Sequence, residues 1–331
     1  PRYRKELPAG VSHAAAAPTL LAFLTESAEL WSHYLEICLH PDHKITAKHA
    51  QRISNSIKII VEHLFASCDA GEARHYLQPI LRQLHAAKDA DDRFVLLDTL
   101  QHVPAELLTG DELLGCLDRI GVLLRAADLR QQIAALRCME YLLPAGGAAA
   151  AGKITALLSR LDSSRETAVR YLLWRLRTAM GATAPLELAE PESQLYLANL
   201  KNAVHWSVKN THIDLLCDDV ARRPETAFHT AMHLSNLLSV SEHLPVRTRA
   251  GEALVEAAAF LTMDQQNEIV VDLLRELEAG QEEVSRYIPQ YLGAMLCRLP
   301  EKEFDEGLAF LAGFIRGSNV ASARAALLTL G

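Results

Sequence analysis

Two histidines, His229 and His233, have the spacing that most directly suggests chemistry in this chain. In the segment ETAFHTAMHLSNLL they lie four residues apart, which places both imidazoles on one face of a helix and suits zinc or nickel. A zinc protease would carry Glu after the first histidine, where this chain has Thr230. His243 is a candidate third ligand. We expect a partly exposed polar flank, with a metal site at the three histidines as the alternative.

A second pattern comes close to a phosphate-binding loop, which needs Gly-x-x-x-x-Gly-Lys followed by Ser or Thr. In residues 146–155, GGAAAAGKIT, Ile154 stands where the magnesium-binding hydroxyl is required. Such a loop also follows a strand, whereas the residues before it have helical periodicity. We therefore expect a turn between two helices, with Pro144 ending the first and Gly146 and Gly147 forming the turn.

A polar cluster near the N-terminus, LHPDHKITAKH, also suggests a metal site. It contains His40, Asp42, His43 and His49. A phosphohydrolase of the HD type needs His directly followed by Asp, and no histidine of this chain precedes an Asp. We expect His40 to end one helix and Asp42 to cap the next.

The segment RETAVRYLLWRLRTAMG provides the best candidate for a binding surface. Its apolar stripe is Val169, Leu172, Leu173, Leu176 and Met180, and beside it Arg170, Trp174 and Arg177 fall at i, i+4 and i+7. An aromatic ring flanked by guanidinium groups can anchor a partner protein, clamp a phosphate or stack on a base. The alternative is that Trp174 packs on a neighbouring helix while the arginines pair with acids such as Asp162 and Glu166.

Helices must position all of these residues, because apolar residues recur at helical spacing along almost the whole chain. Leu113, Leu117, Ile120 and Leu124 fall at i, i+4, i+7 and i+11, one stripe of a helix. Aromatic residues make up only 6% of the chain, and Ala and Leu, which favour helix, carry most of the apolar content. We expect an all-α protein of about fifteen helices joined by short turns.

A fixed period relates the C-terminal helices. Leu254, Leu292 and Leu330 are separated by 38 residues each, and Leu261 and Leu299 by the same interval. Residues 270, 273 and 277 match residues 308, 311 and 315 at this offset, all of them apolar. A period of this length indicates repeated helix pairs.

Helix pairs at this period resemble HEAT and armadillo-like repeats, over residues 89–180 and 244–331. The resemblance implies a right-handed α-α superhelix, a solenoid of about seven to eight helical hairpins that bury their apolar faces against neighbours. The Ala-rich composition is also similar to helical repeats of large bacterial multidomain proteins that carry a nucleotidyltransferase-like domain. From these features we expect N-terminal repeats over 1–180, a linker or long loop over 181–192, and C-terminal repeats over 193–331 that stop within the last repeat. We expect a segment of a longer protein.

Charge and composition limit the classes of partner that we expect for this chain. The formal charge of −8 disfavours sequence-independent nucleic-acid binding, which depends on Lys and Arg neutralising phosphates. No uninterrupted apolar run approaches the ~20 residues of a membrane span, so we expect a cytoplasmic protein without membrane contact. The six cysteines lack a Cys-x-x-Cys pair and are expected to be reduced core thiols. They are Cys38, Cys68, Cys116, Cys138, Cys217 and Cys297.

From these residues we expect a non-catalytic interaction scaffold without a cofactor, which binds a protein partner through the solenoid surface at Arg170, Trp174 and Arg177. Two alternatives stay open. One is a nucleic-acid-binding protein similar to the HEAT-like DNA glycosylases, with the two arginines on phosphates. The other is a metal-dependent enzyme that uses His229 and His233, with His243 as the candidate third ligand.

Overall fold

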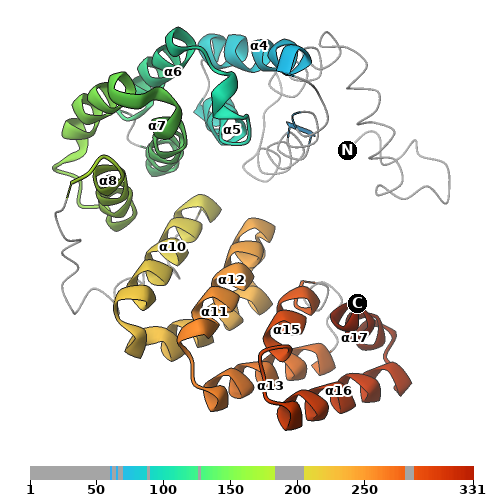
Figure 1. The fold of residues 1–331 in the computed structure, drawn as a ribbon. Helices are drawn as coiled ribbons and strands as arrows, with labels where there is room; N and C mark the ends of the chain where they lie inside the picture. The colour runs from blue at the N-terminus through green and yellow to red at the C-terminus, as the bar shows by residue number, and fades with distance from the viewer. Residues whose placement is uncertain are drawn as a thin grey trace, which may run out of the picture. The chain divides into compact units, whose positions relative to one another are not determined.

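The computed structural model describes residues 60–61, 65, 70–87, 90–125, 128–182, 205–279 and 287–331. These residues form twelve α-helices and four short 3-10 turns, and no strand occurs among them. The chain divides into two compact units, Pro1–Pro185 and Leu186–Gly331 (Figure 1). The predicted all-α class is confirmed.

Unit 1 contains five of these helices. They are α4 (Ala70–Ala86), α5 (Ala90–Leu100), α6 (Gly110–Leu123), α7 (Leu129–Leu158) and α8 (Thr167–Ala179). Helix α4 packs on α5 and α6, and α7 packs on α5, α6 and α8. Thr109 and Glu112 form a reciprocal capping box at the start of α6. Glu112 also accepts hydrogen bonds from Arg74 at 2.7 and 2.9 Å, which ties α6 to α4.

The described part of unit 2 contains seven helices in a two-layered stack. They are α10 (Trp206–Arg222), α11 (Ala227–Val240), α12 (Leu244–Ala257), α13 (Met263–Ala279), α15 (Pro289–Leu296), α16 (Glu301–Arg316) and α17 (Val320–Leu330). One layer runs in the order α10, α12, α15 and α17, and the other in the order α11, α13 and α16, with each helix packed on the next of its layer (Figure 1). This arrangement of helical hairpins in chain order is the predicted solenoid architecture.

The repeat period explains why the stack has a continuous core. Leu254 and Leu292, one period apart, are both fully buried. The predicted stripe of α6 is likewise buried, with Leu117 and Ile120 at 0% exposure. Because each hairpin covers the apolar stripe of its neighbour, a single core extends from hairpin to hairpin within each unit.

Helix α7 contains the turn predicted at the glycines. Gly147 has φ 52° and ψ −144°, a non-helical conformation that separates two helical stretches. The prediction that Pro144 ends the first stretch is wrong, because the proline lies inside it. Near a helix end, proline removes only one backbone hydrogen-bond donor, so the helix can continue past it. The chain turns where φ is positive, a conformation that glycine adopts without steric cost.

By length and composition alone, the segment Leu129–Leu161 is apolar enough to cross a membrane. Gly147 divides it, however, and both halves contribute fully buried side chains to unit 1, among them Ile133 and Ile154. In this structure the segment forms part of the core of unit 1.

Two further expectations concern the cysteines and the linker. Cys116 and Cys138 are buried thiols as predicted, whereas Cys217 is only partly buried and Cys297, the residue after α15, is exposed. Cys38 and Cys68 lie outside the described residues.

The boundary between the units follows Pro185, and because residues 183–192 lie outside the described part, the linker over 181–192 stays a prediction.

Candidate binding surface

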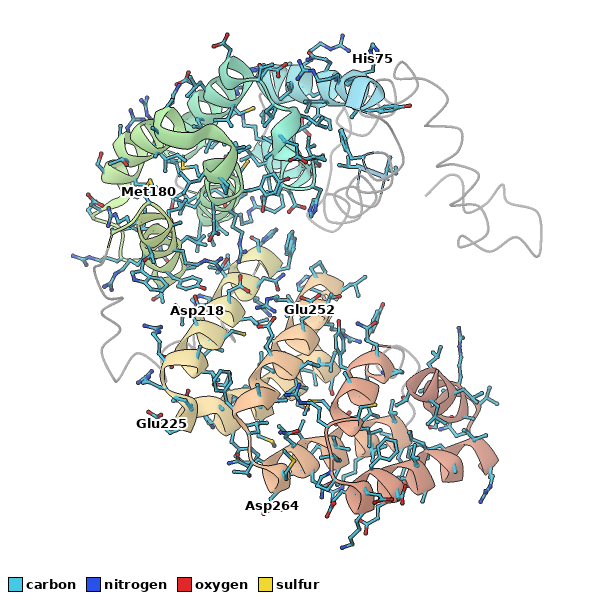
Figure 2. The ribbon with its side chains drawn as sticks, in the orientation of Figure 1. His75, Met180, Asp218, Glu225, Glu252 and Asp264 are labelled. Atoms are coloured by element: carbon cyan, nitrogen blue, oxygen red, sulfur yellow. The ribbon has the colours of Figure 1, made fainter. Side chains whose placement is uncertain are left out.

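Helix α8 presents the predicted surface residues beside a buried stripe. Val169, Leu172 and Leu176 are at most 1% exposed and fix the orientation of the helix. Met180, the last residue of the predicted stripe, is only half-buried at the end of α8 (Figure 2), because the helix ends at Ala179. Arg170, next to Val169, is exposed.

One arginine of this surface pairs with a carboxylate. Arg177 forms an ion pair with Asp162, the first residue after the 3-10 turn that follows α7. This contact is the pairing that the sequence offered as the alternative to a free binding arginine. A guanidinium that already faces a carboxylate gains less from a phosphate, since its charge is partly neutralised.

Trp174 lies half-buried between the two arginines, and its ring stacks on Tyr171 with centroids 6.2 Å apart. Arg175 also contacts Tyr171, with its guanidinium carbon 5.7 Å from the ring centroid. Arg175 in turn pairs with Glu140 of α7 at 2.7 Å. Sequence reasoning missed Tyr171, Arg175 and Glu140. Arg175 lies four residues after Tyr171, a spacing that could have predicted their contact on one helical face. Nothing in the sequence indicates the ion pair between Arg175 and Glu140.

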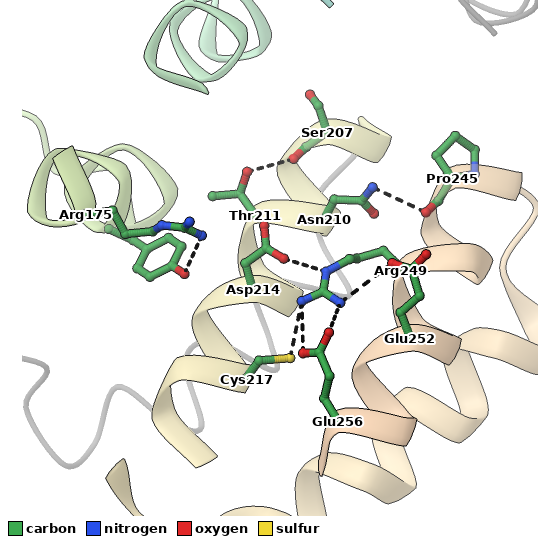
Figure 3. Close-up of polar contacts among 11 residues, drawn as sticks. Arg175, Ser207, Asn210, Thr211, Asp214, Cys217, Pro245, Arg249, Glu252 and Glu256 are labelled. Carbon is green, nitrogen blue, oxygen red and sulfur yellow. Dashed lines mark hydrogen bonds and ion pairs between the residues drawn. The ribbon is translucent and has the colours of Figure 1, made fainter. Parts of the chain in front are cut away.

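A second polar cluster lies between α10 and α12 in unit 2. Nε of Arg249 donates to Oδ1 of Asp214 at 2.6 Å, and its Nη1 donates to Oε1 of Glu256 at 3.0 Å (Figure 3). Glu252 is 3.8 Å away from the same guanidinium. Burial disfavours the charge of Arg249, but Asp214 and Glu256 together outweigh this and raise its pKa. The cluster joins two helices of one layer.

Cys217 lies against this cluster, with Sγ 3.7 Å from Nη2 of Arg249. Burial raises the pKa of the Cys217 thiol to about 12, and the nearby guanidinium lowers it by less. The thiol is therefore protonated near neutral pH and is a poor nucleophile. The arrangement indicates a structural ion-pair cluster.

The histidine pair on α11 lies where the sequence predicted it. Ala227, Ala231 and Leu234 of the predicted stripe are buried, and the rings of His229 and His233 lie beside that stripe. Their Nε2 atoms are 3.3 Å apart and the rings stand edge to face, with centroids 4.6 Å apart. His243 precedes α12, and no group of three or more metal-binding side chains occurs within the described ranges. The structure thus brings two of the three candidate ligands together.

The remaining histidine of interest is His212 in α10, which the sequence did not single out. Only 4% of it is exposed, and no described group hydrogen-bonds to its Nδ1. Burial lowers the pKa of His212 to about 4, so it is neutral in the folded protein near neutral pH. The cluster formed by His40, Asp42, His43 and His49 lies outside the described residues.

Comparison with known proteins shows no family, and the solved structures that are similar to the chain match it only weakly. No family model matches the chain, and no curated protein matches it. Two engineered proteins of known structure are similar to the chain. The first has 15% sequence identity and a TM-score of 0.35, and the match covers 96% of this chain and 83% of that protein. The second has 13% identity and a TM-score of 0.32, and the match covers 89% of this chain and 94% of that protein. A microtubule polymerase structure with an array of tumor overexpressed gene domains is similar at 11% identity and a TM-score of 0.32, covering 95% and 80%. These values are too low to relate the chain to any of the three by function.

Proposed function

We propose that this chain is a non-catalytic scaffold of HEAT-like repeats that binds a protein partner through its helical surface. The observation that carries the proposal is a row of open apolar side chains on the last two described helices. We define the terminal face as Ile315 of α16 with Val320, Leu327 and Leu330 of α17. These side chains are 37%, 81%, 58% and 49% exposed, respectively.

The repeat period supports this proposal, because the residues equivalent to this face are covered in the preceding hairpin. Leu330 corresponds to Leu292 one period earlier, and Ile315 corresponds to Leu277; both counterparts are fully buried. Helix α17 packs on α13 and α15, which carry these counterparts, and the side-chain Oγ of Ser322 donates to the carbonyl of Leu277 at 2.8 Å. The terminal face therefore has the chemistry of a helix-binding interface, and an amphipathic helix pair fits it, whether that pair comes from a partner protein or from a further repeat of the same protein.

The two alternative functions have less support. Nucleic-acid binding needs a positive surface, but the terminal face is apolar, and on α8 Arg175 and Arg177 already face Glu140 and Asp162. A metal-dependent enzyme would need a third ligand or a general base beside His229 and His233, and in the described part of the chain no Asp, Glu, Cys or further His completes such a group.

The test compares three forms of the protein immobilised at equal density: wild type, Leu327→Glu/Leu330→Glu, and Val240→Glu. Val240 is a matched control, because it is an apolar residue with 64% exposure that lies at the end of α11, outside the terminal face. Circular dichroism and thermal midpoints establish that all three are folded.

We expect one specific protein to be retained from cell lysate by wild type and by the Val240 variant, and to be lost by at least tenfold from the double variant. Retention of nucleic acid that is released by salt would support the first alternative instead. Equal retention by all three forms would show that the terminal face is not the binding surface.

A further inference from the structure

We infer that His229 and His233 form a two-histidine chelating site for a divalent transition-metal ion on the surface of α11. This inference does not depend on the proposed scaffold function. It rests on the distance between the two ring nitrogens, on the rigidity of the helix that carries them, and on their access to solvent.

The first element is the distance. The two Nε2 atoms are 3.3 Å apart. In a tetrahedral zinc site, two nitrogens at about 2.0–2.1 Å from the metal lie about 3.3–3.4 Å from each other. The nitrogens of His229 and His233 thus already have the separation that one metal ion requires of two neighbouring ligands. Without metal, the same geometry allows one neutral imidazole to donate its Nε2 proton to the other.

The second element is the scaffold. Ala231 and Leu234, which lie on α11 between and just after the histidines, are 0% exposed and hold the helix in the core. Four-residue spacing on a rigid helix fixes the two rings on one face, so metal binding has little conformational entropy to overcome. His229 is exposed and His233 is half-buried. A metal ion can therefore reach the pair from solvent.

The third element is the kind of metal. Imidazole nitrogen suits Cu²⁺, Ni²⁺ and Zn²⁺, and affinity at such ligands rises toward Cu²⁺ in the first transition series. In the described part of the chain no third side chain joins the pair, so two protein nitrogens form the chelate. Such a site is an open chelate, and it holds its ion more weakly than a structural site with four protein ligands.

The experiment uses the whole chain without a histidine tag, stripped of metal and titrated with CuCl₂, NiCl₂ or ZnCl₂ in a non-chelating buffer by calorimetry. His229→Gln and His233→Gln each remove one ligand. His85→Gln is the matched control, because His85 is also exposed and lies in the last turn of α4, a helix of the other unit. Circular dichroism without metal establishes that each variant is folded.

We expect a binding event of about one equivalent in wild type and in the His85 variant. At this event, we expect each of the two α11 variants to lower the affinity at least tenfold, and Cu²⁺ to bind more tightly than Zn²⁺. Electron paramagnetic resonance of the copper complex should show two coordinated nitrogens in wild type and one in each α11 variant. Unchanged affinity in both α11 variants, or no binding in wild type, would overturn the inference.

Discussion

The ring of Tyr291 on α15 lies against Gly251 on α12 so closely that a Cβ added to the glycine would stand 2.3 Å from Cε2 of the ring. The hydroxyl of Tyr291 also donates to the carbonyl of Thr248 at 3.1 Å, which holds the ring in place. The close approach of two helices in one layer thus depends on the absence of a side chain at position 251.

Gly251→Ala is therefore expected to destabilise unit 2 even though alanine is the better helix former. Forcing a methyl group against a held ring costs about 1–3 kcal/mol. The measurement is urea unfolding followed by circular dichroism. Gly313→Ala in α16 is the control, because nothing lies within 4 Å of a Cβ there, and it should be neutral or stabilising by up to about 1 kcal/mol. Similar stability of the two variants would contradict the packing described.

Gly147→Ala is expected to destabilise unit 1 by about 1–3 kcal/mol, because the native φ of 52° with ψ of −144° is adopted by glycine almost exclusively. Gly152→Ala, five residues later in the same element, has open space around the new methyl group and should not destabilise. Thermal unfolding of both variants checks this contrast. A stable Gly147 variant would mean that the chain does not turn at this residue.

Burial of His212 predicts a pH dependence of stability. Its pKa is about 4 in the folded protein and 6.5 in the unfolded chain, so the unfolded chain takes up the proton first as the pH falls. The stability that it contributes is complete above pH 6.5 and is lost toward pH 4, amounting to about 2 kcal/mol between pH 7.5 and 5. Urea unfolding at both pH values measures this loss. In His212→Leu the loss of stability between pH 7.5 and 5 should be smaller by that amount. An equal loss in the variant and in wild type would show that other titratable groups cause it.

Arg249→Met is expected to destabilise unit 2 by about 2–4 kcal/mol, because it leaves the carboxylate of Asp214, only 8% exposed, without its ion pair. Asp214→Asn/Arg249→Met should recover part of this loss, since the buried charge is gone. Unfolding free energies of both variants give the test. Equal destabilisation in the single and double variants would show that the unpaired charge is not the cause.

The surface at α8 gives a prediction about binding. Arg170→Ala/Trp174→Ala/Arg177→Ala should weaken retention of a protein partner if this helix is part of the interface, because Trp and Arg supply much of the energy of protein interfaces. Asp162→Ala is the control, since it removes the pairing of Arg177 and leaves the three surface residues in place. If the Asp162 variant binds more strongly than wild type and salt removes the gain, a phosphate-bearing ligand is favoured instead.

The sequence by itself determined the local and periodic features of this protein. The helices, the buried stripe of α6, the turn at Gly147 and the helical face shared by His229 and His233 follow from backbone geometry, because the helical period places residues three or four apart on one side. The period of 38 residues likewise determined which positions are equivalent in successive hairpins.

Only the tertiary structure decided the contacts between helices. The pairing of Arg249 with Asp214, the ring of Tyr291 over Gly251, and the exposure of Leu330 depend on how neighbouring helices cross and which side chains meet there. Equivalent leucines such as Leu292 and Leu330 differ in burial because the burial of a side chain depends on the neighbouring helix that covers it. The helical pattern of a sequence shows only on which face of its own helix a residue lies.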